Sequence, residues 1–167
     1  GSDIFPGTTV YERALVDAFY EARSFQPAWT DPGYVREMLQ LLESSEGEGL
    51  DPADYHYDEL LSLQEQYQKS WADKDDLHAQ AEVLLTDGIL LYAKHLKQGK
   101  LDPRELDTSW NYKREEIVPA EVAVELAAAI EDQQVAEILQ RLKPELEFYE
   151  LMKNQLAHYR ELAADET

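Results

Sequence analysis

The chain of 167 residues contains no cysteine, few basic residues and no long apolar run. Without cysteine, these residues form no disulfide bond, no cysteine-ligated zinc site and no thiol nucleophile. No apolar stretch approaches the roughly 20 residues of a membrane-spanning helix, and no basic-then-apolar signal peptide opens the chain. The leading Gly1-Ser2 is typical of a cloning remnant, so we expect residues 1–8 to be a tag remnant and a flexible start.

Acidic residues dominate the charge: 35 aspartates and glutamates stand against 15 lysines and arginines, for a formal net charge of -20. Such a surface repels nucleic-acid phosphates and anionic lipid headgroups. We therefore expect no nucleic acid and no membrane surface among the partners, whereas a cationic or neutral partner stays open. The acidity by itself indicates solubility or adaptation to a salty habitat.

Signals for helix starts and ends recur along the chain, and alternating β-type runs bounded by hairpin turns are missing. The predicted fold class is all-α, a single compact bundle of about seven or eight helices. The domain is expected to span residues 9–164, because no linker rich in glycine, serine or proline divides it. The expected helix starts are the capping box Thr9–Glu12, Asp31-Pro32, Leu50-Asp51-Pro52, Leu101-Asp102-Pro103, Val118-Pro119 and Asp132.

Residues 77–97 form the most apolar segment, with hydrophobic side chains on nearly every face of a helix. A helix that is apolar all round belongs at the centre of a bundle. Gly99 is expected to end it. A last helix is predicted from apolar residues at three- and four-residue spacing between Phe148 and Leu162.

Motifs for catalysis or cofactor binding are missing from the sequence. The Walker, dinucleotide-binding and Gly-x-Ser-x-Gly signatures do not occur, and the four histidines lie far apart. His78 and Glu82 lie one helical turn apart, which is compatible with a metal pair but more typical of a solvated helix face. We therefore predict no catalytic residue, no cofactor and no metal ligand within these residues.

Asp87 interrupts the most hydrophobic helix, next to Thr86. A buried carboxylate must be hydrogen-bonded or paired, since an unpaired buried charge costs several kcal/mol. We interpret Asp87 and Thr86 as a candidate structural anchor that binds an arginine or a loop amide. The alternative is that Asp87 is a functional acid.

Several aromatic residues fall outside the clearest helical stripes. Such side chains either plug the ends of a helical bundle or anchor an interface, and one sequence does not separate the two roles. We take three of them as candidate contacts to another domain or a partner: Trp29, Trp110 and Tyr112.

Five phrases in a fixed order carry a resemblance to a known family. They are YEARSFQPAW at 20–29, EGLDPADY at 48–55, LLTD at 84–87 with YAKHLKQGKLDP at 92–103, Trp110, and the segment 139–149 with Tyr159-Arg160. Together they resemble the scaffold domain of large, multidomain L,D-transpeptidases of Gram-negative bacteria, over residues 11–162. The resemblance implies a periplasmic or envelope enzyme that cross-links peptidoglycan and whose cysteine nucleophile lies in a separate catalytic domain.

The resemblance therefore implies a non-catalytic scaffold whose partners are the catalytic and peptidoglycan-binding domains of a parent chain, with peptidoglycan itself as a further partner. No catalytic residue is carried over, because this chain has no cysteine. Two alternatives stay open: a free-standing helical adaptor that binds a protein partner, and a metal or acid/base enzyme of another type.

Overall fold

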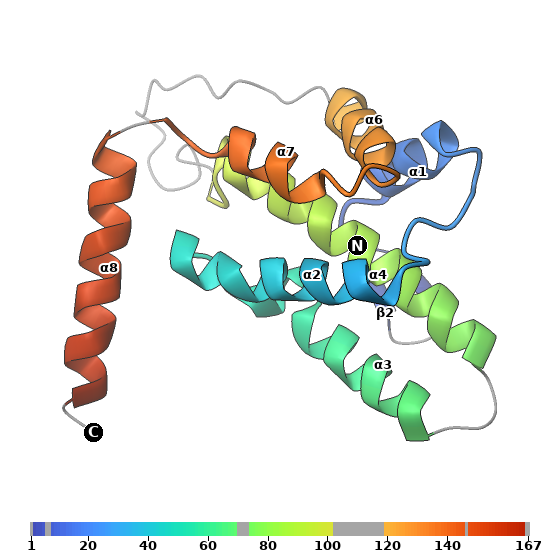
Figure 1. Cartoon of the computed structure of the whole chain (residues 1–167), viewed down its shortest axis with the longest axis horizontal. Helices are drawn as coiled ribbons and strands as arrows, with labels where there is room; N and C mark the ends of the chain where they lie inside the picture. The colour runs from blue at the N-terminus through green and yellow to red at the C-terminus, as the bar shows by residue number, and fades with distance from the viewer. Residues whose placement is uncertain (1, 6–7, 70–73, 102–118, 146, 166–167) are drawn as a thin grey trace.

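The structure is a computed structural model that describes residues 2–5, 8–69, 74–101, 119–145 and 147–165. Helix α4 (Lys74–Gln98) runs through the centre of the molecule. Around it, α2 (Pro32–Glu43) and α3 (Tyr57–Lys69) lie below in Figure 1. Above it lie α1 (Arg13–Ala22), α6 (Pro119–Ala129) and α7 (Val135–Leu142). The described residues thus confirm the all-α class and the central position of the most apolar helix.

Close packing of α4 against its neighbours depends on a glycine in its middle. A Cβ atom at Gly88 would lie 2.5 Å from the backbone oxygen of Tyr55, so the two backbones touch directly at this point. The surrounding side chains of α4 are almost completely buried, among them Leu84, Leu85 and Ile89. Gly99 follows the helix with a left-handed φ of 76°, as the sequence predicted for its end.

Two of the expected helix starts are confirmed by their capping bonds. Asp31 accepts a hydrogen bond from the backbone N–H of Gly33 at 2.7 Å and begins α2. Asp51 accepts one from Ala53 at 3.0 Å, but the element that it begins is the short 3-10 helix η2 (Pro52–Tyr55). His56 then adopts a left-handed φ of 62° and turns the chain into α3.

Two other expected starts are wrong, and remote side chains explain why. Thr9 lies in strand β2 (Thr8–Val10), which pairs antiparallel with β1 (Ser2–Phe5), and α1 begins only at Arg13. Asp87 binds the backbone amides that precede α1, so no local capping box is needed. Asp132 does not cap α7 either. The first amide of that helix, from Val135, donates to the hydroxyl of Tyr34 at 3.2 Å.

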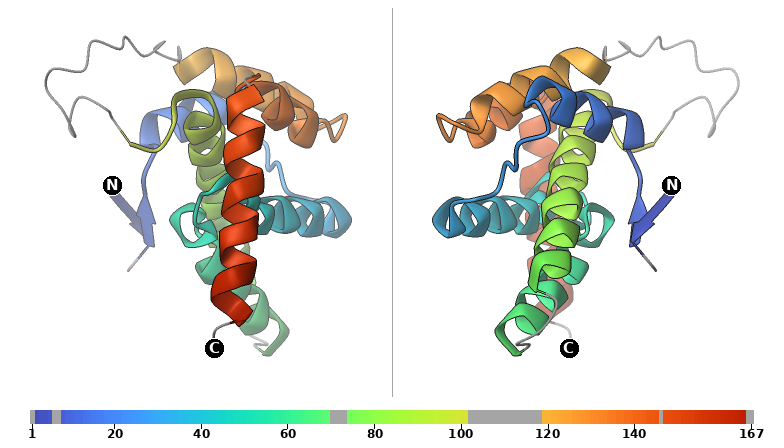
Figure 2. Two further views of the ribbon diagram at one scale, coloured as in Figure 1. Left: turned by 90° about the vertical axis from the view of Figure 1, so that its left-hand side faces the viewer. Right: turned by 90° about the vertical axis from the view of Figure 1, so that its right-hand side faces the viewer.

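Helix α8 (Glu147–Asp165) lies at the side of the molecule (Figures 1 and 2). It contacts the rest through the 3-10 helix η1 (Ser44–Glu48), which follows α2. Its apolar spacing correctly predicts a helix, yet most of these apolar side chains are exposed. Within the described ranges, no helix combines the length and the hydrophobicity needed to cross a bilayer.

Candidate functional site

Asp87 on α4 is completely buried and holds two segments that are distant in sequence. Its two carboxylate oxygens accept hydrogen bonds from the backbone amides of Tyr11 and Glu12, both at 2.8 Å. Oδ2 is also 2.7 Å from Nε2 of His56, whose ring stacks on Tyr11. The partners are therefore loop amides and a histidine rather than an arginine. The carboxylate joins the start of α1 to the turn before α3, which is the geometry that an anchor requires.

Glu82, five residues earlier on α4, anchors the loop between α1 and α2. Its carboxylate accepts hydrogen bonds from the backbone amides of Ala28 at 2.6 Å and Trp29 at 3.1 Å, and from the hydroxyl of Tyr20 at 2.9 Å. Burial, together with the nearby Glu82 charge, raises the pKa of the Tyr20 hydroxyl far above its usual value. The hydroxyl therefore stays protonated and donates to the carboxylate.

Thr86 and Trp29 are joined in the same cluster. The indole N–H of Trp29 donates to Oγ1 of Thr86 at 2.9 Å, and that hydroxyl donates in turn to the backbone oxygen of Glu82. Trp29 is partly buried and packs against the hydrophobic core. The structure thus places the polar end of Trp29 inside the domain. The other two candidate contacts, Trp110 and Tyr112, lie outside the described residues.

Arg23 ties α1 to α6; in the sequence it stands out only as part of the phrase at 20–29. Its guanidinium donates to the backbone oxygens of Ala127 and Pro27, both at 3.0 Å, and to the carboxylate of Glu131 at 2.9 Å. The side chain of Arg23 is only 8% exposed, so these bonds satisfy a nearly buried cation. Its place in that phrase, four residues before Pro27, was the signal that could have identified its role.

His78 and Glu82, which the sequence places one turn apart, contact different partners. His78 points to the ring of Tyr67, with centroids 4.6 Å apart, while Glu82 binds the amides described above. Among the described residues, no three histidine, aspartate or glutamate side chains are grouped so as to hold a metal ion.

An open crevice of about 250 Å³ lies beside His56, between β2, α3 and α4. Most of its polar side chains already bind one another or the core: Gln66 donates to Ser62, Gln80 to Thr8, and His56 is hydrogen-bonded to Asp87. These bonds stabilise the walls of the crevice rather than orient a nucleophile.

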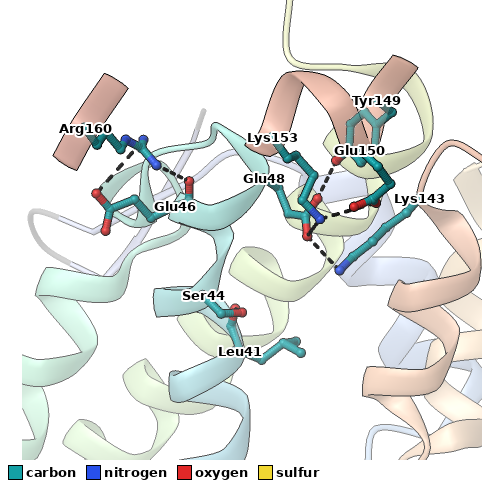
Figure 3. Close-up of polar contacts among 9 residues, drawn as sticks. All are labelled: Leu41, Ser44, Glu46, Glu48, Lys143, Tyr149, Glu150, Lys153 and Arg160. Carbon is teal, nitrogen blue, oxygen red and sulfur yellow. Dashed lines mark hydrogen bonds and ion pairs between the residues drawn. The ribbon is translucent and has the colours of Figure 1, made fainter. Parts of the chain in front are cut away.

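Helix α8 is attached by a further carboxylate, that of Glu48 in η1 (Figure 3). The side chain of Glu48 is 7% exposed and accepts hydrogen bonds from Lys143 Nζ at 2.8 Å, Lys153 Nζ at 3.0 Å and the Tyr149 hydroxyl at 2.6 Å. Burial alone would raise the pKa of Glu48, but these three bonds outweigh it and lower the pKa below its ordinary value. The carboxylate therefore stays charged and holds α8 in place.

Further contacts extend this attachment along α8. Arg160 donates to the backbone oxygen of Glu46 at 2.7 Å, and Figure 3 shows it reaching η1 from the far end of the interface. Leu156 lies against Gly49, whose φ of 77° ends η1. The face of α8 that carries Tyr149, Lys153, Leu156 and Arg160 is thus its docked face.

A different face of α8 is apolar and exposed. Five large hydrophobic side chains on it expose between 48% and 67% of their area. They recur at three-, four- and seven-residue spacing and so form one stripe. The residues of this exposed stripe are Phe148, Leu151, Met152, Tyr159 and Leu162.

A comparison with family models identifies the family of the chain. The model described as Scaffold domain matches residues 14–156, which is most of the sequence and includes Glu48, Glu82 and Asp87. No curated protein and no solved structure matches the chain. The chain therefore belongs to the Scaffold domain family.

Proposed function

We propose that this domain is the non-catalytic scaffold of a periplasmic peptidoglycan L,D-transpeptidase, in which it holds the catalytic and glycan-binding domains in working geometry. Its contribution to the reaction is proximity and orientation, and the bond-making cysteine lies in another part of the parent polypeptide. Support comes from the order of the sequence phrases and from membership of the Scaffold domain family.

One observation carries the non-catalytic role: the distinctive residues of the phrases bind each other across the fold. In the first phrase, Tyr20 and Trp29 bind Glu82 and Thr86, and Arg23 binds α6. The second and third phrases contribute in the same way. Tyr55 hydrogen-bonds His95 at 2.9 Å, and Asp87 binds the start of α1. Side chains used in this way fix the positions of helices, as a rigid support requires.

The test has two steps. The first is to determine the native reading frame that contains these residues, and the second is to compare the cross-linking activity of its full-length product with that of the 167-residue chain. The proposal expects a segment with cysteine and histidine outside these residues, and cross-linking of stem peptides by the full-length product but not by the 167-residue chain. Deleting residues 14–156 from the full-length product is expected to impair cross-linking. Cross-linking by the isolated chain would overturn the proposal.

A free-standing adaptor is the second candidate, and the exposed stripe of α8 favours it, since such surfaces are typical of protein interaction sites. The reading frame separates the two candidates. A stop codon near Thr167 with no catalytic segment favours the adaptor, and a catalytic segment favours the scaffold.

A further inference from the structure

The exposed stripe of α8 is distinct from the face that docks on η1. Tyr149, Lys153 and Arg160 all point to η1. At 100° per residue, the stripe residues lie about 110–120° around the helix from that docked face. The stripe is therefore available while α8 remains attached to its own domain.

Its length and spacing fit one known mode of recognition. From Phe148 to Leu162 the stripe extends about 21 Å, at a rise of about 1.5 Å per residue. An amphipathic helix with anchors at such spacing binds by laying its apolar face into a hydrophobic groove. The complementary surface is thus an elongated apolar groove on a folded protein.

The charged residues of α8 indicate which charge the partner surface must carry. Glu147 borders the stripe, and Glu150 and Glu161 lie further round the exposed side of α8, whereas its two cations, Lys153 and Arg160, contact the acidic groups of η1. A groove rimmed by lysine and arginine complements this pattern. A second copy of the chain, itself at -20, and an anionic bilayer are both repelled.

We infer that the exposed stripe of α8 binds an apolar groove, rimmed by lysine and arginine, on a folded domain of the parent polypeptide outside these 167 residues. This inference rests on the proposed function, because it assigns the surface through which the scaffold holds another domain. It is tested separately from that function.

The two methionines provide a matched pair of probes. Met152 lies in the stripe and is 56% exposed, whereas Met38 is completely buried in the core. With dilute hydrogen peroxide and mass spectrometry, Met152 of the 167-residue chain is expected to oxidise much faster than Met38. In the full-length native product, oxidation of Met152 is expected to slow at least tenfold, while Met38 does not change.

Two substitutions test whether contact at the stripe is what protects Met152 from oxidation. Leu151→Glu puts a charge into the stripe and is expected to restore fast oxidation of Met152 in the full-length product. Asn154→Glu adds the same charge on the acidic side of α8 and is expected to leave the protection intact. Both side chains are exposed, so both variants of the 167-residue chain are expected to melt like the original.

A carbodiimide, which couples carboxylates to amines at zero length, tests the cationic rim. Coupling of Glu147, which borders the stripe, to a lysine outside the 167 residues supports the inference. Coupling only to lysines of the same chain or of a second copy, slow oxidation of Met152 in the isolated chain, or fast oxidation in the full-length product overturns it.

The two claims fail in different ways. A reading frame with other domains but no cysteine nucleophile, combined with protected Met152, removes the proposed function and leaves the docking surface. A catalytic product with unprotected Met152 removes the docking surface alone. A reading frame that encodes no further domain overturns both.

Discussion

Replacing Glu48 with glutamine removes the charge that holds α8 on η1 and keeps the size of the side chain. The side chain of Glu48 is 7% exposed and binds Lys143, Lys153 and Tyr149. Each hydrogen bond to a charged group contributes about 1.5–3 kcal/mol. Because the three bonds share one carboxylate and glutamine retains an acceptor, we expect a loss of roughly 2–3 kcal/mol in docking rather than their sum.

Hydrogen exchange by mass spectrometry is the assay, because the loss is local. Helix α8 meets the domain through η1, so its amides are expected to exchange roughly 30- to 150-fold faster, given tenfold per 1.4 kcal/mol. The amides of α4 are expected to keep their protection. Glu150→Gln is the matched control, since Glu150 contacts the same Lys153 at 3.5 Å but is 64% exposed. Its effect is expected to stay below about threefold.

The same carboxylate sets a pH limit on docking. The pKa of Glu48 in the folded protein lies below its ordinary value of 4.5, so its contribution is complete above about pH 4.5 and is lost as pH falls through the lowered value. Relative to the intrinsic exchange rate, which itself falls in acid, the protection of α8 is therefore expected to drop before that of α4, and Glu48→Gln to remove this step. Unchanged α8 protection in Glu48→Gln, or equal loss in α4, would refute the reasoning.

Three further substitutions test the fold. Asp87→Asn keeps one acceptor but sets the side-chain amide against two backbone N–H groups. We therefore expect a loss of about 2–4 kcal/mol in the free energy of unfolding and a melting temperature roughly 10 °C lower by calorimetry. An unchanged melting temperature would refute the anchor. Gly88→Ala is expected to destabilise by about 1–2 kcal/mol in urea despite better helix propensity, because its Cβ meets Tyr55. The Ser45 hydroxyl is buried without a hydrogen-bond partner among the described residues, so Ser45→Ala is expected to be neutral or to stabilise by up to about 1 kcal/mol.

The fold was predictable where local signals decide it. The apolar segment at 77–97 identified the central helix, and the Asp-Pro pairs at 31–32 and 51–52 marked real capping sites. Prediction failed where a distant side chain replaces the local cap. Thr9 has the spacing of a capping box, yet Asp87, 75 and 76 residues away from the two amides, binds the start of α1.

The candidate site was predictable only in part, for the same reason. A carboxylate in an apolar helix pointed to Asp87, because burial of a charge requires partners. Glu48 gave no such signal, since it is one acid among many in a glycine-bearing turn and its partners lie about a hundred residues later. Likewise, the spacing of the last helix predicts an apolar stripe but not that α8 presents it to solvent.

Severing the scaffold from the parent enzyme tests the central claim most directly. The rate of stem-peptide cross-linking is measured for the full-length product, for the product without residues 14–156, and for that truncated product with the 167-residue chain added separately. If the scaffold acts by positioning domains within one polypeptide, truncation lowers the cross-linking rate, and adding the 167-residue chain at micromolar concentration does not restore it. An undiminished rate after truncation, or cross-linking by the added chain alone, would contradict it.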